Sequence, residues 1–418
     1  MCGTIRLYVL YHSMHIFVRI LIKLVTIVGF TCLAAPIVVL MRLIRPVIRI
    51  RLGALDIGRL GGSFGAFFYL AVKQSIAIPK YTTDVFYFIP TTVISNSFWV
   101  TLLAREIHLL APVQFLSHLL HAIYRLNRYL PHADLNEVPL LGSFTTSNAV
   151  TRAIVANPNV LLKFTRAEEQ LGRENTVALG IPVGHQFVCF HARDSSYLSE
   201  KHPGVDWHYH DYRDSRIGNY ISAAEELTRR GLRAVRIGEI VAEPIVHSSS
   251  AVIDYSLSGK RSDFMDIYLG AKCKFMICSE TGLNLVPTMF RRPILFVNWV
   301  LIPYMYIWST GVVITKKFFS VEKNRLLTYR EILSRGNGVY GDLGFVAESG
   351  IQLIESTSAE ICAAAVEMND RIDGLWTDTE EDIVLQNQFW DMFGADRFRN
   401  PELRIGAEFL RSNNDLLH

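Results

Sequence analysis

The chain has 418 residues, of which 50% are hydrophobic and 19% charged, and its formal net charge is +3. This composition is typical of a globular protein of two or three domains and excludes a largely disordered chain. Because 42 basic side chains face 39 acidic ones, we expect no nucleic-acid partner, which would require a basic face or stripe.

The first predicted element is an apolar segment, 24–41, whose 18 residues include no charged side chain. It just reaches the length of a transmembrane helix, although Pro36 interrupts it. Several arginines follow closely, at positions 42, 45, 49 and 51. They argue against a cleaved signal peptide and favour a cytoplasmic body. A spanning helix, a kinked re-entrant helix and a buried core helix are all open, and we expect residues 1–44 to anchor the chain to membrane lipids.

Residues 45–182 are expected to form a first α/β domain. A strand-like run begins at Val47 and leads into a glycine-rich loop, 56–65, and a second strand is expected at 85–90. A helix at 95–110 follows, capped by Ser95 or Ser97. Asp56, just past the first strand, is a candidate general base by position, although a structural turn aspartate is the commoner role.

Residues 183–372 are expected to form a second α/β domain, because strands and helices alternate along it. The predicted strands are 186–193, 232–238, 273–278 and 293–298, and the predicted helices are 219–230, 262–271 and 282–291. Such alternation predicts a parallel sheet with right-handed crossovers. We expect residues 373–418 to form a helical tail.

The cysteines show no metal-binding or disulfide pattern. Six occur, at positions 2, 32, 189, 273, 278 and 362, without C-x-x-C or zinc spacing. Three of them, at 189, 273 and 278, lie in apolar strand-like runs. They are therefore expected to be buried free thiols, which suggests a reducing compartment.

Ser279, Glu280, Thr281 and Gly282 follow a predicted buried strand and precede a helix. Ligands bind at the carboxyl ends of strands in open parallel sheets, and a helix start offers free N–H groups to an anion. An ordinary capped turn is an equally good interpretation of this loop alone. The ligand-binding interpretation of this loop is therefore favoured only if a second polar loop lies beside it.

His191 and Arg193 provide such a loop at the end of another predicted strand. Arg193 could contact a diphosphate with two parallel hydrogen bonds, and His191 could polarise a phosphate oxygen or transfer a proton. The alternative is a loop ion pair between Arg193 and Asp194 or Asp214. We favour the functional interpretation, because loops at parallel strand ends converge.

Asp263 and Asp266 lie at the start of the predicted helix 262–271. Asp263 could hold a ribose or base, or simply cap the helix, and Asp266 is expected to turn inward as a structural acceptor. No two aspartates in the chain have Asp-x-Asp spacing. We therefore expect no metal or other cofactor, with arginine, lysine and a helix start offsetting the phosphate charge.

Two segments of the second predicted domain resemble a known protein family. The segment RSDFMDIYLGAKCKFMICSETGLNLVPTMFRRPILFVN resembles the nucleotide-binding half of GT-B glycosyltransferases, in particular a bacterial family found in surface-polysaccharide loci. FHARDS is similar to the His-x-Arg motif of fucosyltransferase-like families, whose arginine contacts the diphosphate of a GDP-sugar. The match covers 185–300 best and 305–410 more loosely. It aligns His191, Arg193, Asp266 and Ser279 to Gly282 with the family motifs.

The resemblance implies a GT-B fold, with two Rossmann-like domains facing across a cleft. It implies a metal-independent and inverting glycosyltransferase that uses a nucleoside-diphosphate sugar and a glycan or lipid-linked acceptor. Its expected location is the bacterial inner membrane, with the catalytic body on the cytoplasmic side. The alternatives are a non-catalytic GT-B-like membrane assembly protein and another sugar-nucleotide enzyme such as an epimerase. One departure is Gly62, where the family pattern Arg-Ile-Gly-His has a histidine.

Overall fold

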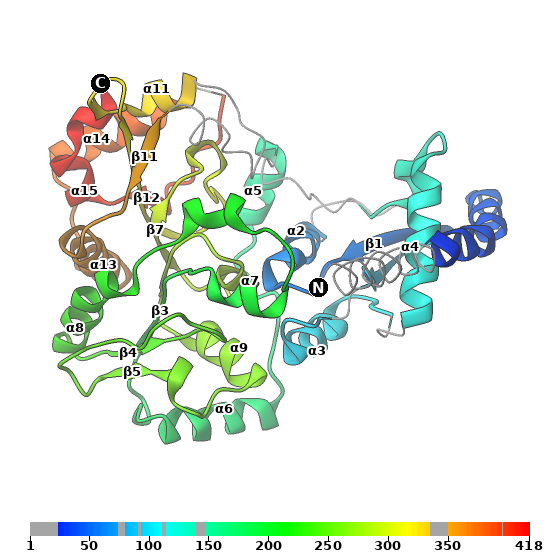
Figure 1. The fold of residues 1–418 in the computed structure, drawn as a ribbon, viewed down its shortest axis with the longest axis horizontal. Coiled ribbons are helices and arrows are strands. Elements are labelled where there is room, and N and C mark those ends of the chain that lie inside the picture. The colour runs from blue at the N-terminus through cyan, green and yellow to red at the C-terminus, as the bar shows by residue number, and fades with distance from the viewer. Residues whose placement is uncertain are drawn as a thin grey trace, which may run out of the picture. The chain divides into compact units, whose positions relative to one another are not determined.

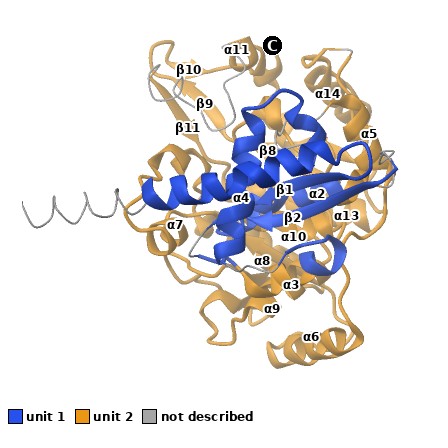
Figure 2. Cartoon of the chain, turned by 90° about the vertical axis from the view of Figure 1, so that its right-hand side faces the viewer, with its two compact units in different colours: residues 1–69, 76–95, 103–140 blue, residues 70–75, 96–102, 141–418 orange. Residues whose placement is uncertain are grey.

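The computed structural model describes residues 24–73, 80–90, 93–110, 114–138, 147–334, 350–394 and 396–418. The chain divides into two compact units, coloured separately in Figure 2. Unit 1 comprises residues 1–69, 76–95 and 103–140, and unit 2 comprises residues 70–75, 96–102 and 141–418. The segment 141–182, which the sequence suggested as the end of the first domain, therefore belongs to the larger unit.

Unit 1 is built around two parallel strands, β1 (Arg49–Leu55) and β2 (Thr82–Phe88). An apolar N-terminal helix, Leu24–Leu43, and α4 (Gln114–Arg128) pack on them. Between the strands the chain forms a 3-10 turn, Leu60–Ser63, and the start of α2 (Phe64–Val72). α3 (Ser97–Glu106) follows β2, close to the helix predicted at 95–110.

The core of unit 2 is a seven-stranded parallel sheet (Figure 1). Its spatial order is β12-β8-β7-β6-β3-β4-β5. The strands are β3 (Phe187–His191), β4 (Arg233–Arg236), β5 (Val252–Asp254), β6 (Met276–Cys278), β7 (Ile294–Trp299), β8 (Gly311–Thr315) and β12 (Leu403–Ile405). The six strands that come first along the chain, β3 to β8, have the spatial order of a Rossmann fold. The predicted α/β fold class is thus confirmed.

Helices cover this sheet, two of them close to the bounds predicted at 219–230 and 262–271. They are α5 (Asn148–Ala156), α6 (Arg166–Ala178), α7 (Ser196–Lys201), α8 (Ile221–Arg229), α9 (Asp263–Lys272), α10 (Leu285–Met289), α11 (Tyr329–Ser334), α13 (Ser358–Ile372), α14 (Glu380–Asp391) and α15 (Ala407–Ser412). α8 packs on α13, and α9 packs on α10 and α6. Gly172 lets α6 approach α9, because a Cβ at this position would lie only 2.1 Å from the ring of Tyr268.

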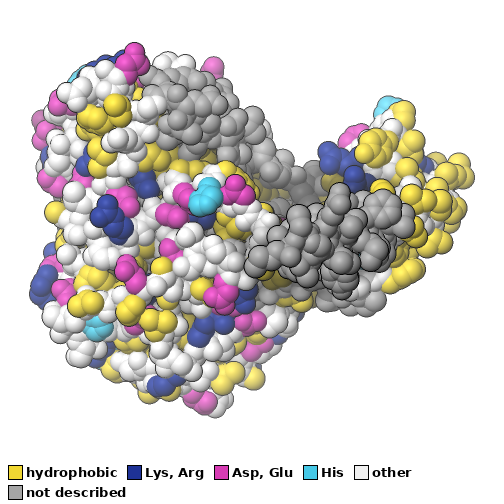
Figure 3. Space-filling view, viewed as in Figure 1, with side chains coloured by type: hydrophobic (Ala, Val, Ile, Leu, Met, Phe, Trp, Pro, Cys, Tyr) yellow, Lys and Arg dark blue, Asp and Glu magenta, His cyan; other side chains and the backbone are white. Residues whose placement is uncertain are grey.

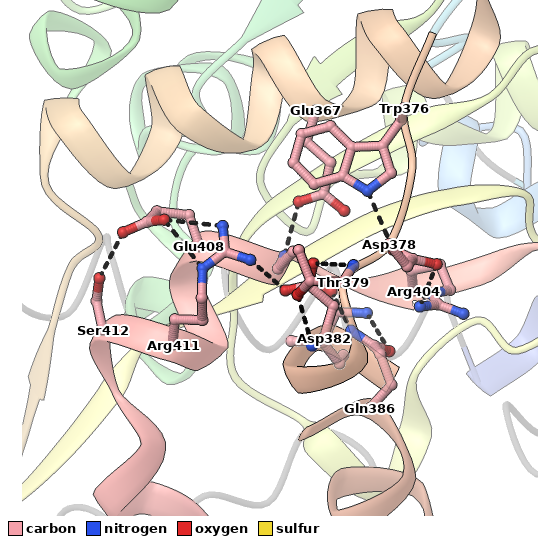
Figure 4. Close-up of polar contacts among 12 residues, drawn as sticks. Glu367, Trp376, Asp378, Thr379, Asp382, Gln386, Arg404, Glu408, Arg411 and Ser412 are labelled. Carbon is pink, nitrogen blue, oxygen red and sulfur yellow. Dashed lines mark hydrogen bonds and ion pairs between the residues drawn. The ribbon is translucent and has the colours of Figure 1, made fainter. Parts of the chain in front are cut away.

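A small antiparallel sheet, β10-β9-β11, follows β8. Its strands are β9 (Lys317–Ser320), β10 (Arg325–Leu326) and β11 (Ile351–Ile354). The C-terminal tail is not helical throughout as predicted, because Leu403–Ile405 forms the edge strand β12 against β8. Figure 4 shows why the strand is stable there, since the Gln386 side chain bonds both the N–H and the carbonyl of Ile405.

Candidate functional site

The centre of the unit 2 sheet is a topological switch point. After β3 the chain continues to β4 and β5 on one side, and after β6 it continues to β7 and β8 on the other. Because the connections leave these two neighbouring strands toward opposite sides, a crevice forms at their carboxyl ends, and ligands bind there in open α/β sheets. β3 and β6 are neighbours, with His191 opposite Cys278. The two predicted loops therefore do lie at one site.

A direct hydrogen bond joins these loops. The Arg193 backbone N–H donates to the Ser279 hydroxyl over 2.9 Å, and both residues are buried. Ser279 is thereby fixed as an acceptor inside the loop, and its backbone faces the same strand end as Arg193. The convergence predicted from the sequence is confirmed for this pair.

The Arg193 guanidinium is held from one side. Its Nη1 donates to the His210 carbonyl over 3.2 Å and forms an ion pair with Asp214. Of the two ion-pair partners considered from the sequence, Asp214 is the one observed. Nη2 is buried and has no protein partner among the described residues. Burial, and after it the charge of Arg213, lowers the pKa of Arg193 to about 10, so the group is charged at neutral pH.

Asp194 takes a structural role beside it. Its carboxylate accepts the N–H of Ser196 over 2.9 Å and that of Ala242 over 3.0 Å. The first bond caps the turn into α7, and the second ties this turn to the segment after β4. Asp194 therefore shapes the loop in which Arg193 lies.

His191 is fixed at the end of β3. Its Nδ1 lies 2.9 Å from the Ile237 carbonyl, a contact that requires the proton on Nδ1 and leaves Nε2 as an acceptor. Gly238 makes room for this ring, because a Cβ there would lie 3.2 Å from Nδ1. Burial lowers the pKa of His191. At neutral pH the imidazole is therefore uncharged, with Nε2 as its acceptor.

The loop after β6 is tighter than predicted. Thr281 caps a short 3-10 turn, Gly282–Asn284, and the α-helix that follows spans only Leu285–Met289. The predicted helix 282–291 is therefore wrong in length, because Pro287 and the apolar residues around it fill a short buried turn. Such a short helix contributes a weaker dipole than the sequence suggested.

Glu280 is buried in this loop and is 1% exposed. It lies near Tyr212, whose pKa is raised first by burial and then by the Glu280 charge. This places the loop that follows β6 next to the segment that holds His210 and Asp214.

Two residues that the sequence analysis missed also belong to this region. Asn284 is fully buried, and both polar atoms of its amide lack a partner among the described residues. Lys316, just past β8, is 5% exposed and donates to the Asp214 carbonyl over 2.7 Å. Burial lowers the pKa of Lys316. In the sequence, Asn284 is marked only as a polar residue inside an apolar run, and Lys316 only as part of a lysine pair that follows a strand-like run.

Asp263 and Asp266 lie at the first turn of α9 with different partners. The Asp263 carboxylate accepts the N–H and hydroxyl of Ser97, both over 2.7 Å, and so caps α3. Asp266 accepts the Tyr255 hydroxyl over 2.8 Å and pairs with Arg261 at 2.7 Å. Asp266 therefore turns inward, as expected. A ligand role for either carboxylate stays a prediction.

Asp56 belongs to unit 1. Its carboxylate accepts the Gly58 N–H over 2.9 Å and lies 3.6 Å from Arg59. A Cβ at Gly62 would lie 2.5 Å from the Asp56 carbonyl oxygen. The loop therefore has the geometry of a tight turn, and the general-base role of Asp56 stays a prediction.

Within the described ranges, no group of three or more histidine, cysteine, aspartate or glutamate side chains could hold a metal ion. The cationic groups near the strand ends include Arg193, Arg213 and Lys316.

No family model and no curated protein matches the chain. Among solved structures, it is similar to the ADP-heptose lipopolysaccharide heptosyltransferase II of E. coli, with 13% identity over 59% of this chain and 84% of that one and a TM-score of 0.33. A family 9 glycosyltransferase from Veillonella parvula gives 12% identity, 64% and 86% coverage and a TM-score of 0.38. The E. coli heptosyltransferase WaaC with ADP-2-deoxy-2-fluoro heptose has 13% identity over 60% of this chain and 89% of that one, with a TM-score of 0.31. These likenesses are partial, with TM-scores below 0.4.

Proposed function

We propose that this protein is a membrane-associated glycosyltransferase that uses a nucleoside-diphosphate sugar as donor. The observation that supports it best is the buried Arg193 guanidinium at the switch point of a Rossmann-type sheet, with Nη2 unpaired. Buried donors without a partner are rare, because each costs about 1–3 kcal/mol. A diphosphate oxygen bound at this strand end would satisfy the donor and match its charge.

The proposed reaction is displacement at the anomeric carbon of the donor sugar. An acceptor hydroxyl forms the new bond to C1 while the bond from C1 to the diphosphate oxygen breaks, and a general base takes the hydroxyl proton. Arg193, with Lys316 close to its Asp214 partner, would offset the charge that develops on the leaving diphosphate. The neutral His191, whose Nε2 is an acceptor, is the base candidate in unit 2, and Asp56 is the candidate in unit 1.

The acceptor is proposed to be a glycan or lipid-linked glycan of a bacterial surface polysaccharide, made at the cytoplasmic side of the inner membrane. The apolar helix Leu24–Leu43 supports this part, since within the described residues it is the one helix long and apolar enough to cross a membrane.

Thermal unfolding of the detergent-solubilised protein against GDP, UDP, ADP, CMP and dTDP tests donor binding. One of these ligands, at about 100 times its dissociation constant, is expected to add about 2.7 kcal/mol of stability. The same shift is expected in EDTA if phosphate charge is offset without metal. Release of that nucleoside diphosphate from its sugar donor in the presence of an acceptor then measures transfer.

Arg193→Ala is expected to abolish the ligand-induced shift, and Arg193→Lys to weaken ligand binding about 10- to 100-fold, because lysine keeps the charge but not the paired donors. Arg229→Ala is the matched control, because Arg229 is largely exposed and pairs with Glu226 outside the site. Full activity of Arg193→Ala would contradict the proposal. No shift with any nucleotide would favour a non-catalytic assembly protein, and a free sugar-nucleotide product with no glycan extension would favour an epimerase.

A further inference from the structure

The apolar helix Leu24–Leu43 is a fixed part of unit 1. Ala34, Val38 and Met41 lie on one face of it and are nearly fully buried against the strands and α4. At the middle of the helix, Phe30 contacts the ring of Phe115 at 5.2 Å and stacks on His118. At its end, Arg42 donates to Asn127 over 2.8 Å. The helix thus contacts α4 at two places, through Phe30 and through Arg42, and its buried face packs on the core of unit 1.

The opposite face of the same helix is apolar and uncovered. Only 17% of its most apolar window is buried. Its exposed hydrophobic side chains include Val25, Val28, Leu33, Val39, Leu40 and Leu43, each more than half exposed. They extend along the whole helix, and Figure 3 shows hydrophobic side chains gathered over this end of unit 1. A continuous apolar face of this size is not left in water by soluble proteins.

Arginines border this face, and neutral groups hold them. Arg42 donates to the Asn127 side chain and the Pro131 carbonyl. Arg45 donates to the Asn136 side chain and, over 3.0 Å, to the His132 carbonyl. These acceptors position the guanidiniums without cancelling their charge. Burial, followed by the charges of Arg42 and Arg49, lowers the pKa of Arg45, and the charge of Asp134 partly opposes this effect. Three arginine charges thus lie near one aspartate charge.

We infer that this helix lies along the membrane surface, with its exposed face in the acyl chains of one leaflet and Arg42 and Arg45 against anionic lipid headgroups. A perpendicular span of about 30 Å would place the buried face of the helix, and the part of α4 that packs on it, within the hydrocarbon. The polar side chains His118 and His121 of α4 would then be held there at high cost. An in-plane helix buries the apolar face to about 5–10 Å and leaves α4 in the headgroup region.

This inference rests on the membrane association proposed above, but not on the sugar chemistry. Fluorescent labels on single cysteines at positions 25, 32 and 39 of the full chain measure depth, using vesicles with lipids brominated at different carbons. Cys32 is exposed and provides the middle position. Positions 25 and 39 lie about 21 Å apart along the axis. In-plane binding predicts equal depth at all three positions.

A profile that is deepest at position 32 and shallow at 25 and 39 would overturn the inference, because that is the pattern of a spanning helix. The headgroup contact is tested with vesicles of phosphatidylcholine with and without phosphatidylglycerol. Binding is expected to be stronger with phosphatidylglycerol and to fall in 0.5 M salt. Equal binding to both vesicles would overturn the charge contact.

Arg42→Gln and Arg45→Gln are each expected to weaken binding to phosphatidylglycerol vesicles about five-fold. Arg128→Gln is the control, because it removes one charge from the same region but that charge already faces Glu137 at 3.6 Å. An equal loss from all three variants would overturn the role of the two held arginines. Absence of binding to either vesicle would overturn membrane association as well, while the nucleotide shifts would still decide the donor site.

Discussion

At the scale of single residues, unit 2 holds several ionisable groups whose environment changes their protonation. Asp266 is 7% exposed beside Arg261 and Tyr255. Burial raises its pKa from 3.8 to about 6, against the lowering effect of Arg261. The folded state therefore binds this proton more tightly than the unfolded state does.

The stabilisation from this proton should be complete below about pH 4 and lost as pH rises to about 6, by at most about 3 kcal/mol. Asp266→Asn cannot titrate, so its unfolding free energy should vary less with pH across this window than that of the wild type. Chemical denaturation at several pH values from 4 to 7 measures the difference. Parallel profiles for the two proteins would contradict the raised pKa.

Gly62 is the residue where the sequence departs from the family pattern that it resembles. A Cβ at this position would collide with the Asp56 backbone. Gly62→Ala and Gly62→His are therefore expected to destabilise unit 1, by about 1–3 kcal/mol for alanine. Gly29→Ala is the control in urea unfolding, because nothing lies within 4 Å of that position.

If position 62 had room for the histidine of the family pattern, Gly62→His would cause no loss of stability. An unchanged urea midpoint for Gly62→His would therefore contradict the steric explanation of this glycine. It would also make the missing histidine a functional difference rather than a consequence of the turn.

At the scale of elements, the C-terminal tail is tied to the sheet by buried polar contacts (Figure 4). Glu367 accepts the Ala407 N–H over 2.7 Å, and Asp378 pairs with Arg371 and Arg404. The Gln386 side-chain amide bonds the Ile405 N–H and carbonyl, as a neighbouring strand would. An edge strand that ends in side-chain amides instead of open backbone groups cannot pair with another chain.

Gln386→Met should therefore cost about 2–4 kcal/mol, since it leaves a buried N–H and a buried carbonyl of Ile405 without partners. Asn387→Ala, at the exposed neighbouring position, should change stability by less than about 0.5 kcal/mol. Thermal or urea unfolding of both variants makes the comparison. Similar small losses in both would show that water replaces the amide of Gln386.

At the scale of the whole molecule, each unit combines an ordinary α/β core with one feature that stability alone does not explain. In unit 2 the feature is a buried, half-paired arginine at the switch point of the sheet. In unit 1 it is an apolar helix that is packed on one face and bare on the other. The first suits an anionic ligand and the second suits a lipid surface, and the proposed action on a lipid-linked acceptor would use both.

The sequence by itself determined the α/β class, most strands of the second unit and the two loops that meet at the site. It could do so because apolar runs, helix caps and turn residues are local signals, and because parallel strand ends must lie at one edge of a sheet. The strand at Phe187–His191 and the meeting of the loops after β3 and β6 follow from these rules.

Only the tertiary structure decided which partners the polar groups take. Asp214 rather than Asp194 pairs with Arg193, Asp263 caps a helix from far along the chain, and Lys316 and Asn284 are buried near the strand ends. The strand Leu403–Ile405 also needed the distant β8 and Gln386 to form. These outcomes depend on contacts between segments tens to hundreds of residues apart, and neither local propensity nor spacing encodes such contacts.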